Sequence, residues 1–317
     1  MPFAIGDGHT RGRLRRIRLP AHLGCDLFRI LAFNRVSMTQ EFGACAPGRL
    51  DRSVIALTSR LPDNWLGLRL SIGLRRIVMM RLADDRGFDV VRWGLRMRLH
   101  PRGNGCEKGA LFVPQMYEAS ERRILRAEIE KTRAVGRAFV FVDIGANVGL
   151  FSLFVASCAG PDAKILAIEP EPENVKRLRF NLVANPDISV RVLSLALGER
   201  EQRVALDVHR SDRGGTRTRA LGEGEPPHIA TVECRPLLDV LRNEGVTRID
   251  ALKIDVEGVE DTIMGPFFRN APDELWPKLV IIEDARDAWR DDVFAVLEKC
   301  GYAVTARSKL NVMLSRR

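Results

Sequence analysis

From Phe139 to the end of the chain, short apolar runs alternate with longer segments in which apolar residues recur at helical spacing. The runs predict seven strands, at 139–144, 164–169, 189–195, 249–254, 278–283, 302–307 and 312–315. The intervening segments predict helices at 150–158, 172–184, 236–243, 259–268 and 288–300. This alternation is typical of an α/β fold, a mostly parallel sheet with helices on both faces. Because only residues 308–311 join the last two strands, the terminal strand is expected to be antiparallel.

The pattern is weaker before residue 139. Residues 88–99 alternate well enough for a strand or a hairpin, residues 119–135 have helical spacing, and a helix is possible near 63–80. We therefore divide the chain into three parts: an Arg-rich extension of unknown structure at 1–85, a strand or hairpin with a helix at 86–138, and a cofactor-binding domain at 139–317.

One long excursion interrupts the cofactor-binding domain. Residues 199–234 are rich in Gly and Arg and are flanked by two strand-like pieces, 203–208 and 229–234. Long excursions from a compact sheet often carry function. Arg210, Arg213, Arg217 and Arg219 lie here and could bind an acidic or phosphorylated acceptor, although an exposed charged loop has the same composition.

The composition is that of an ordinary folded protein, with 45% hydrophobic and 29% charged residues among 317, which excludes a disordered or collagen-like chain. Of the net charge of +9, the excess lies in residues 1–100, with 18 Arg, no Lys and 8 acidic residues. Its densest run, Arg11–Arg18, could contact nucleic acid or an anionic membrane. Because no aromatic residue interleaves with the run, a solvated arm is favoured and we expect no nucleic-acid partner.

The cysteines and the apolar stretches bear on location. The six cysteines are scattered without a Cys-x-x-Cys pair, which argues against zinc and favours a reducing compartment such as the cytoplasm. The longest apolar stretch, 139–159, contains Asp143 and two glycines, so we expect a buried strand, a loop and a helix there. We expect neither a signal peptide nor a transmembrane segment.

The clearest motif is Asp143-Ile-Gly-Ala-Asn-Val-Gly149, between a strand and a helix. Such a loop lies at the carboxyl end of a strand, where doubly wound sheets bind cofactors. A dinucleotide fingerprint needs Gly where Asn147 stands, and a carboxylate would repel a pyrophosphate. The positively charged S-adenosylmethionine suits Asp143 better, because the carboxylate can attract its ammonium group. Alternatively, Asp143 could only cap the helix.

Two further strand ends carry acids. Glu169, followed by Pro170, stands where an acid can accept hydrogen bonds from ribose hydroxyls. Asp255 and Glu257 end the fourth strand and are candidates to orient or deprotonate a substrate hydroxyl. His209, the only His of the excursion, is a third candidate base.

Other acids near these strand ends have weaker assignments. Glu260 lies in the first turn of the next helix, where it could only complement the helix dipole. Glu283 and Asp284 could add to an acidic cluster that binds Mg²⁺. Because the cluster has no His and no strict spacing, we expect no metal site.

Together these segments resemble the FkbM-type S-adenosylmethionine-dependent methyltransferases. The resemblance rests on FVDIGANVG at 141–149, AIEPEPENVKRLRFNL at 167–182, ALGER at 196–200, LKIDVEGVE at 252–260 and VIIED at 280–284, and it includes the pair Tyr117-Glu118. It implies a class I, Rossmann-like methyltransferase that methylates a hydroxyl, often of a sugar or natural product. The expected cofactor contacts are Asp143, Gly145, Ala146, Asn147, Gly149, Glu169, Pro170 and Ala196.

Two alternatives remain open at this point. A nicotinamide-dependent oxidoreductase would bind NAD, which Asn147 disfavours. A non-catalytic protein could use the fold as a scaffold and bind an anionic partner through its Arg-rich N-terminus, although intact acids at three strand ends argue against a dead site. Methylation of oxygen rather than nitrogen rests on the resemblance, and the sequence predicts no oligomeric state.

Overall fold

The computed structural model describes residues 41–83, 86–208, 213–222 and 230–317. Its centre is a seven-stranded sheet in the order β12-β13-β11-β10-β3-β4-β5. The strands are β3 (Val140–Ile144), β4 (Lys164–Ile168), β5 (Arg191–Leu193), β10 (Ala251–Ile254), β11 (Leu279–Glu283), β12 (Tyr302–Arg307) and β13 (Asn311–Arg316). β13 alone runs opposite to the other six strands and pairs antiparallel with both β11 and β12, as predicted for the terminal strand. It lies between β11 and β12, one place in from the edge of the sheet.

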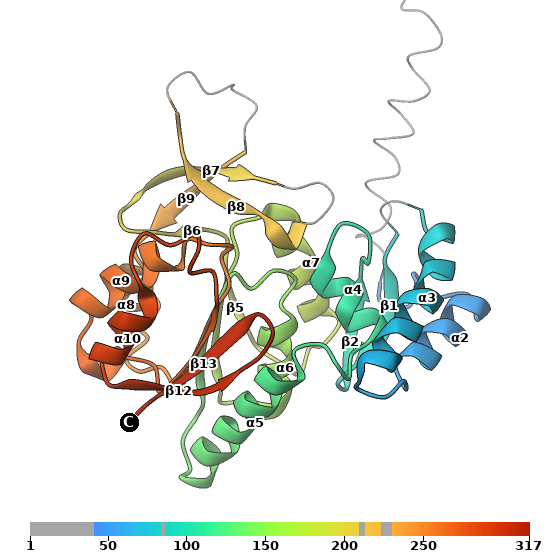
Figure 1. Cartoon of the computed structure of the whole chain (residues 1–317), viewed down its shortest axis with the longest axis horizontal. Helices are drawn as coiled ribbons and strands as arrows, with labels where there is room; N and C mark the ends of the chain where they lie inside the picture. The colour runs from blue at the N-terminus through green and yellow to red at the C-terminus, as the bar shows by residue number, and fades with distance from the viewer. Residues whose placement is uncertain (1–40, 84–85, 209–212, 223–229) are drawn as a thin grey trace, which may run out of the picture.

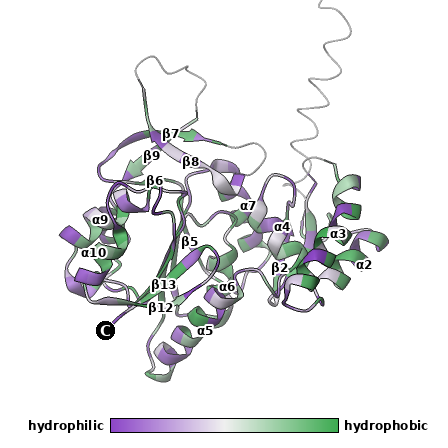
Figure 2. Cartoon of the chain, in the orientation of Figure 1, coloured by the Kyte–Doolittle hydropathy of each residue, from purple (hydrophilic) through white to green (hydrophobic). Residues whose placement is uncertain are grey.

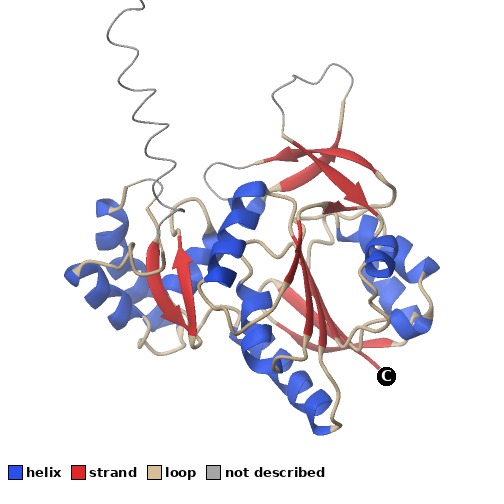
Figure 3. Cartoon of the chain, turned by 180° about the vertical axis from the view of Figure 1, so that it is seen from behind, coloured by secondary structure: helices blue, strands red, loops and turns tan. Residues whose placement is uncertain are grey.

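Helices cover both faces of this sheet (Figure 3). Because side chains alternate along a strand, Val142 and Ile144 pack toward one face and Phe141 toward the other. On the first face lie α8 (Leu237–Asn243), α9 (Glu260–Asn270) and α10 (Val293–Lys299), and on the second lie α5 (Ala119–Ala134), α6 (Leu150–Ala159) and α7 (Pro172–Val183). The predicted α/β class is confirmed.

Residues 41–118 build a smaller layer beside α6 and α7 (Figure 1). It contains α2 (Arg49–Thr58), α3 (Trp65–Arg81), the hairpin β1 (Phe88–Arg92) and β2 (Leu95–Leu99), and α4 (Gly105–Phe112). One apolar cluster joins all of these to α6, and it crosses residue 85, where the sequence suggested a boundary. A buried ion pair between Arg177 and Glu107 at 2.7 Å fixes α7 to α4. The sequence predicted α3 and the hairpin but missed α2.

A second sheet lies over the carboxyl end of the main one (Figure 1). It has the order β6-β9-β7-β8, formed by β6 (Ala196–Leu197), β7 (Gln202–Asp207), β8 (Arg217–Ala220) and β9 (Thr231–Arg235), with the 3₁₀ turn η1 (Arg213–Gly215) before β8. The two strand-like pieces of the Gly- and Arg-rich excursion are thus β7 and β9, which pair antiparallel. The excursion is a cover over the strand ends.

Two predicted elements are clearly shorter in the structure. The strand expected at 189–195 is only three residues long, and the helix expected from 288 begins at Val293 because the Asp292 side chain caps it. A second 3₁₀ turn, η2 (Asp273–Leu275), precedes β11. The apolar stretch 139–159 is β3, a loop and α6, as predicted. Among the described helices, none has the length and apolarity needed to cross a membrane.

Candidate functional site

The loop after β3 is held against the end of β4 by backbone hydrogen bonds. Gly145 and Ala146 both donate their N–H to the carbonyl of Ile168, at 2.9 and 3.1 Å. Gly145 has φ +74°, and a Cβ there would lie 1.8 Å from the carbonyl oxygen of Asp255. Only glycine therefore allows β3 and β10 to end so close together.

Glu169, directly after β4, fixes the same loop. Its Oε2 accepts the N–H of Asn147 at 2.7 Å, and its Oε1 accepts the N–H of Glu171 at 2.9 Å. Asn147 has φ +52°, an uncommon conformation for a residue with a side chain. Burial raises the pKa of Glu169 to about 7. The carboxylate is thus held in a fixed orientation at the end of the strand.

Asp143 lies deeper, inside the protein. Its Oδ2 accepts the N–H of Ser152 at 3.0 Å and the Ser152 hydroxyl at 2.6 Å, in the first turn of α6. Burial raises the pKa of Asp143. This contact is the helix-capping role that the sequence left open as the alternative to a cofactor contact.

A cavity of about 40 Å³ lies where these loops meet the second sheet. Its lining includes eight of the residues singled out from the sequence, namely Gly145, Asn147, Glu169, Pro170, Ala196, Arg213, Asp255 and Glu257. Apolar side chains complete the floor, among them Ile144, Ile168, Leu195 and Ile263. Within the described part of the chain, Asp143, Ala146 and Gly149 do not line it. His209 and Arg210 lie outside the described residues.

The cover over this cavity is η1. Arg213 donates its backbone N–H to the carbonyl of Gly103 and its Nη1 to Glu171 Oε1, at 2.6 and 3.1 Å. Its own carbonyl accepts the side-chain amide of Asn174 at 3.3 Å. The loop before α4 and the start of α7 therefore hold this turn down, whereas the more distal Arg217 and Arg219 are exposed.

Acids gather at the carboxyl ends of β10 and β11. Lys253 donates to Asp255 Oδ2 at 2.9 Å. Burial disfavours the Lys253 ammonium, but neighbouring carboxylates, with Asp255 first, raise its pKa. Burial, together with Asp255 and Glu257, raises the pKa of Glu283 to about 8. Glu257 has φ +61°, a left-handed backbone conformation. Its side chain therefore points in a different direction from that of a residue with negative φ.

Glu260 lies at the same edge. Glu260 Oε1 accepts the N–H groups of Val256 and Gly258, and its Oε2 accepts Trp289 Nε1 at 2.7 Å. Glu260 therefore holds the loop in shape. Over the residues that the structure places, no group of three or more His, Cys, Asp or Glu side chains has an arrangement that could hold a metal ion.

A second cavity, of about 680 Å³, adjoins the first, because Gly214 and Glu257 line both. Its other polar lining comes from far apart in the chain, from Asp63, Cys106, Tyr117, Glu118, Glu121, Arg123, Lys309 and Asn311. Glu118 Oε2 is buried and has no hydrogen-bond partner among the described atoms. Burial raises the pKa of Glu118 to about 7. The sequence gave Tyr117 and Glu118 only as part of a resemblance, and nothing there placed them at the site.

Comparison with known proteins places this arrangement in a family. The Methyltransferase FkbM domain matches residues 143–304, about half of the chain. This chain belongs to the FkbM methyltransferase family. It is 31% identical over 196 residues to "Methyltransferase sdnD" of Sordaria araneosa, covering 52% of this chain and 73% of that protein. It is 28% identical over 205 residues to "AMB antimetabolite synthetase AmbE" of Pseudomonas aeruginosa, of which it spans only 10%.

Among solved structures, the likeness is to methyltransferases of low identity. A precorrin-6y C5,15-methyltransferase from Geobacter metallireducens has a TM-score of 0.38 at 15% identity, covering 66% of this chain and 92% of that one. A SAM-dependent methyltransferase from Agrobacterium tumefaciens has a TM-score of 0.39 at 12% identity, covering 74% and 69%. Scores this low add nothing to the sheet order described above.

As a member of this family, the chain is an enzyme that uses S-adenosylmethionine. Its membership in the family decides against the nicotinamide-dependent and non-catalytic alternatives. The residues of the first cavity fit this cofactor, because an acid at the end of β4 stands beside apolar side chains and the glycine loop brings no cation. The present volume of about 40 Å³ is well below the ~300 Å³ or more of pockets for drug-sized ligands. The cavity as it stands is therefore narrower than a pocket that encloses a ligand of this size.

Proposed function

We propose that this methyltransferase transfers a methyl group to a hydroxyl of a sugar, glycan or natural product. The observation that carries the proposal is the second cavity, which meets the cofactor cavity at Glu257. A transferase for a small acceptor needs two adjoining sites that share a boundary at the reacting atoms. The size of the second cavity, about 680 Å³, suits a sugar or a natural product of similar size.

We assign the cofactor contacts to the lining of the first cavity. Glu169 accepts hydrogen bonds from the ribose hydroxyls, and the loop at Gly145–Asn147 supplies backbone groups. Ile168 and Leu195 present apolar surface to the adenine. Asp143 contributes indirectly, because its bond to Ser152 fixes the start of α6 beneath the loop. Ala146 and Gly149 shape the loop in the same indirect way.

The chemistry requires one proton to leave the acceptor. When bound, S-adenosylmethionine would supply an electrophilic methyl group on a positively charged sulfur. As the acceptor oxygen bonds to that carbon, the carbon–sulfur bond would break and neutral S-adenosylhomocysteine would leave. Glu257, at the boundary between the cavities, takes the hydroxyl proton as the new O–C bond forms. Glu118 accepts a second hydrogen bond from the acceptor through its unpartnered oxygen. Asp255, paired with Lys253, keeps the edge of the site in place.

The location is proposed on the state of the thiols. The five cysteines of the described ranges are free. Isolated free thiols are typical of a reducing compartment, so we propose that the reaction takes place in the cytoplasm.

The test is a methyl-transfer assay with purified full-length chain, S-adenosylmethionine and two acceptor panels. One panel contains monosaccharides and polyhydroxylated natural products, and the other contains matched compounds in which an amine replaces the hydroxyl. Mass spectrometry of the products is expected to show methyl ethers from the first panel, with loss of product in Glu257→Gln. Transfer to the amine panel alone would overturn the assignment of hydroxyl acceptors.

A further inference from the structure

Helix α3 has two apolar faces, and only one of them is covered. Gly67, Ser71 and Val78 lie on the buried face, against the cluster shared with α2 and α4. About a third of a turn around the helix axis from this face, an apolar stripe follows the helix at spacings of four and three residues. We call it the α3 stripe, and it consists of Leu66, Leu70, Gly73, Ile77 and Met80.

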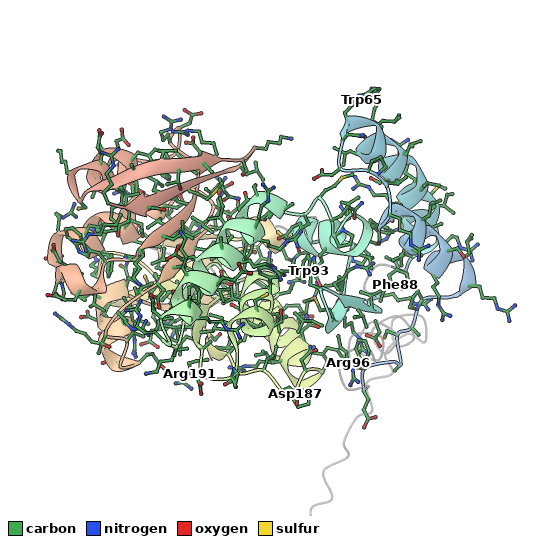
Figure 4. The ribbon with its side chains drawn as sticks, turned by 90° about the horizontal axis from the view of Figure 1, so that it is seen from below. Trp65, Phe88, Trp93, Arg96, Asp187 and Arg191 are labelled. Atoms are coloured by element: carbon green, nitrogen blue, oxygen red, sulfur yellow. The ribbon has the colours of Figure 1, made fainter. Side chains whose placement is uncertain are left out.

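The α3 stripe is well exposed. Met80 is 78% exposed and Leu66 is 50% exposed, and Trp65, at the start of the helix, is 70% exposed. Figure 4 shows Trp65 at the outer end of α3, away from the main sheet, and Figure 2 shows hydrophobic residues along the ribbons of α2 and α3. Contiguous exposed apolar surface of this kind marks an interaction site.

The charges beside the α3 stripe have one sign. Helix α3 contains Arg69, Arg75, Arg76 and Arg81 and no acidic residue. With about 3.6 residues per turn, Arg69 and Arg76 flank the stripe on one side and Arg81 flanks it on the other. An exposed apolar stripe with Arg on both sides suits the interface of an anionic bilayer.

This charge decides between the possible occupants. A second copy of the chain packed stripe to stripe would bring two rows of Arg together, which is unfavourable. Residues 1–40 of the same chain carry seven Arg and two Asp, so they have the same sign as α3. A folded stretch of nucleic acid would neutralise the Arg but leave the apolar side chains uncovered.

We propose that the α3 stripe docks this methyltransferase on the surface of an anionic phospholipid bilayer. The apolar side chains enter the boundary between headgroups and acyl chains, and the flanking guanidinium groups bind lipid phosphates. Asp63, which lines the acceptor cavity, stands two residues before α3. Docking therefore brings one edge of the acceptor cavity close to the membrane.

The experiment uses the full chain and two kinds of vesicle, phosphatidylcholine alone and an equal mixture of phosphatidylcholine with phosphatidylglycerol. The stripe variant is Leu70→Glu with Ile77→Glu, at exposed positions of α3. The matched control is Val135→Glu with Val183→Glu, which makes the same change of charge at exposed apolar residues elsewhere. Circular dichroism and thermal unfolding verify that both variants fold.

We expect the wild-type chain and the control to co-sediment with the anionic vesicles and not with the neutral ones. The stripe variant should bind the anionic vesicles at least about tenfold more weakly, because it lacks two of the apolar side chains that enter the bilayer in the wild type. The emission of wild-type Trp65 should shift to shorter wavelength on the anionic vesicles, and Trp65→Phe should lose that shift.

Four results would overturn the proposal. Equal binding of the stripe variant and the control would assign membrane binding to another part of the chain. Equal binding of the wild type to neutral and anionic vesicles would contradict the role of the arginines. A wild-type dimer in light scattering that becomes a monomer in the stripe variant would show that a second copy covers the α3 stripe. If the stripe variant lost as much affinity for an RNA oligonucleotide as for anionic vesicles, relative to the wild type, the site would bind polyanions in general rather than a bilayer.

Discussion

Replacement of Glu169 by Gln should separate cofactor binding from stability. The carboxylate accepts one backbone N–H on each oxygen, from Asn147 and Glu171. Glutamine keeps the shape but offers only one accepting oxygen, so one of these N–H groups loses its partner, at a cost of about 1–3 kcal/mol. Against this, burial raises the pKa of Glu169 from 4.5 to about 7, which corresponds to about 3 kcal/mol against the ionised form in the folded state.

These two contributions largely offset each other above pH 7, so the free energy of unfolding of Glu169→Gln should stay close to that of the wild type. The pH dependence should change, however. Because the folded pKa lies above the unfolded one, the wild type holds this proton more tightly when folded, and its stability falls as pH rises from 4.5 to about 7. Glutamine does not titrate, so the variant should lose less stability over this window.

Cofactor affinity should behave differently. A hydrogen bond to a charged acceptor contributes about 1.5–3 kcal/mol, so S-adenosylmethionine should bind Glu169→Gln about 10- to 100-fold more weakly. Isothermal titration calorimetry at pH 8 measures the affinity, and differential scanning calorimetry from pH 5 to pH 8 measures the stability. Glu130→Gln, an exposed acid of α5, serves as the control. Unchanged affinity, or a fall in Tm of more than about 10 °C, would refute this reasoning.

Three other substitutions test the rest of the site. Asp143→Ala removes the acceptor of the Ser152 N–H, so it should lower the free energy of unfolding by about 1–3 kcal/mol in urea titrations. Calorimetry should also show weaker binding of S-adenosylmethionine. An unchanged affinity would exclude Asp143 from any role in the cofactor site. Arg213→Ala breaks the ion pair with Glu171, so stopped-flow measurements should show cofactor dissociation about two- to fivefold faster. An unchanged dissociation rate would mean that η1 does not cover the bound cofactor. Glu257→Gln should keep the cofactor affinity within about twofold but slow single-turnover transfer by about 100-fold or more, and full transfer activity would exclude Glu257 as the base.

The main sheet and the cofactor loop could be predicted because their signals are local. An apolar run followed by Gly145 or by Glu169 marks the end of a buried strand, and parallel strands bring such ends to one edge. Glu169 after β4 and the pair Asp255 and Glu257 after β10 meet in the structure for this reason. The role of Asp143 was less certain from the sequence, since an acid between a strand and a helix is compatible with both a ligand contact and a cap.

The acceptor cavity could not be predicted, because its lining is assembled by tertiary packing. Glu118 is brought to Glu257 by the packing of the layer formed by residues 41–118 against α6 and α7. Helix α2 was missed for a related reason. Its buried residues are Val54, Ile55 and Thr58, of which only the adjacent pair is apolar, so the sequence shows little helical periodicity.

The division of the site between the two cavities explains why membership in the family leaves the acceptor open. The match to the FkbM domain, residues 143–304, contains most of the cofactor cavity. Most of the acceptor cavity comes from outside it, from Asp63, Cys106 and the start of α5 on one side and from residues 308–311 on the other. Side chains that select the acceptor are therefore free to differ between family members that bind the cofactor in the same way. Acceptor identity should accordingly follow the residues around Tyr117 and Lys309 rather than the glycine loop.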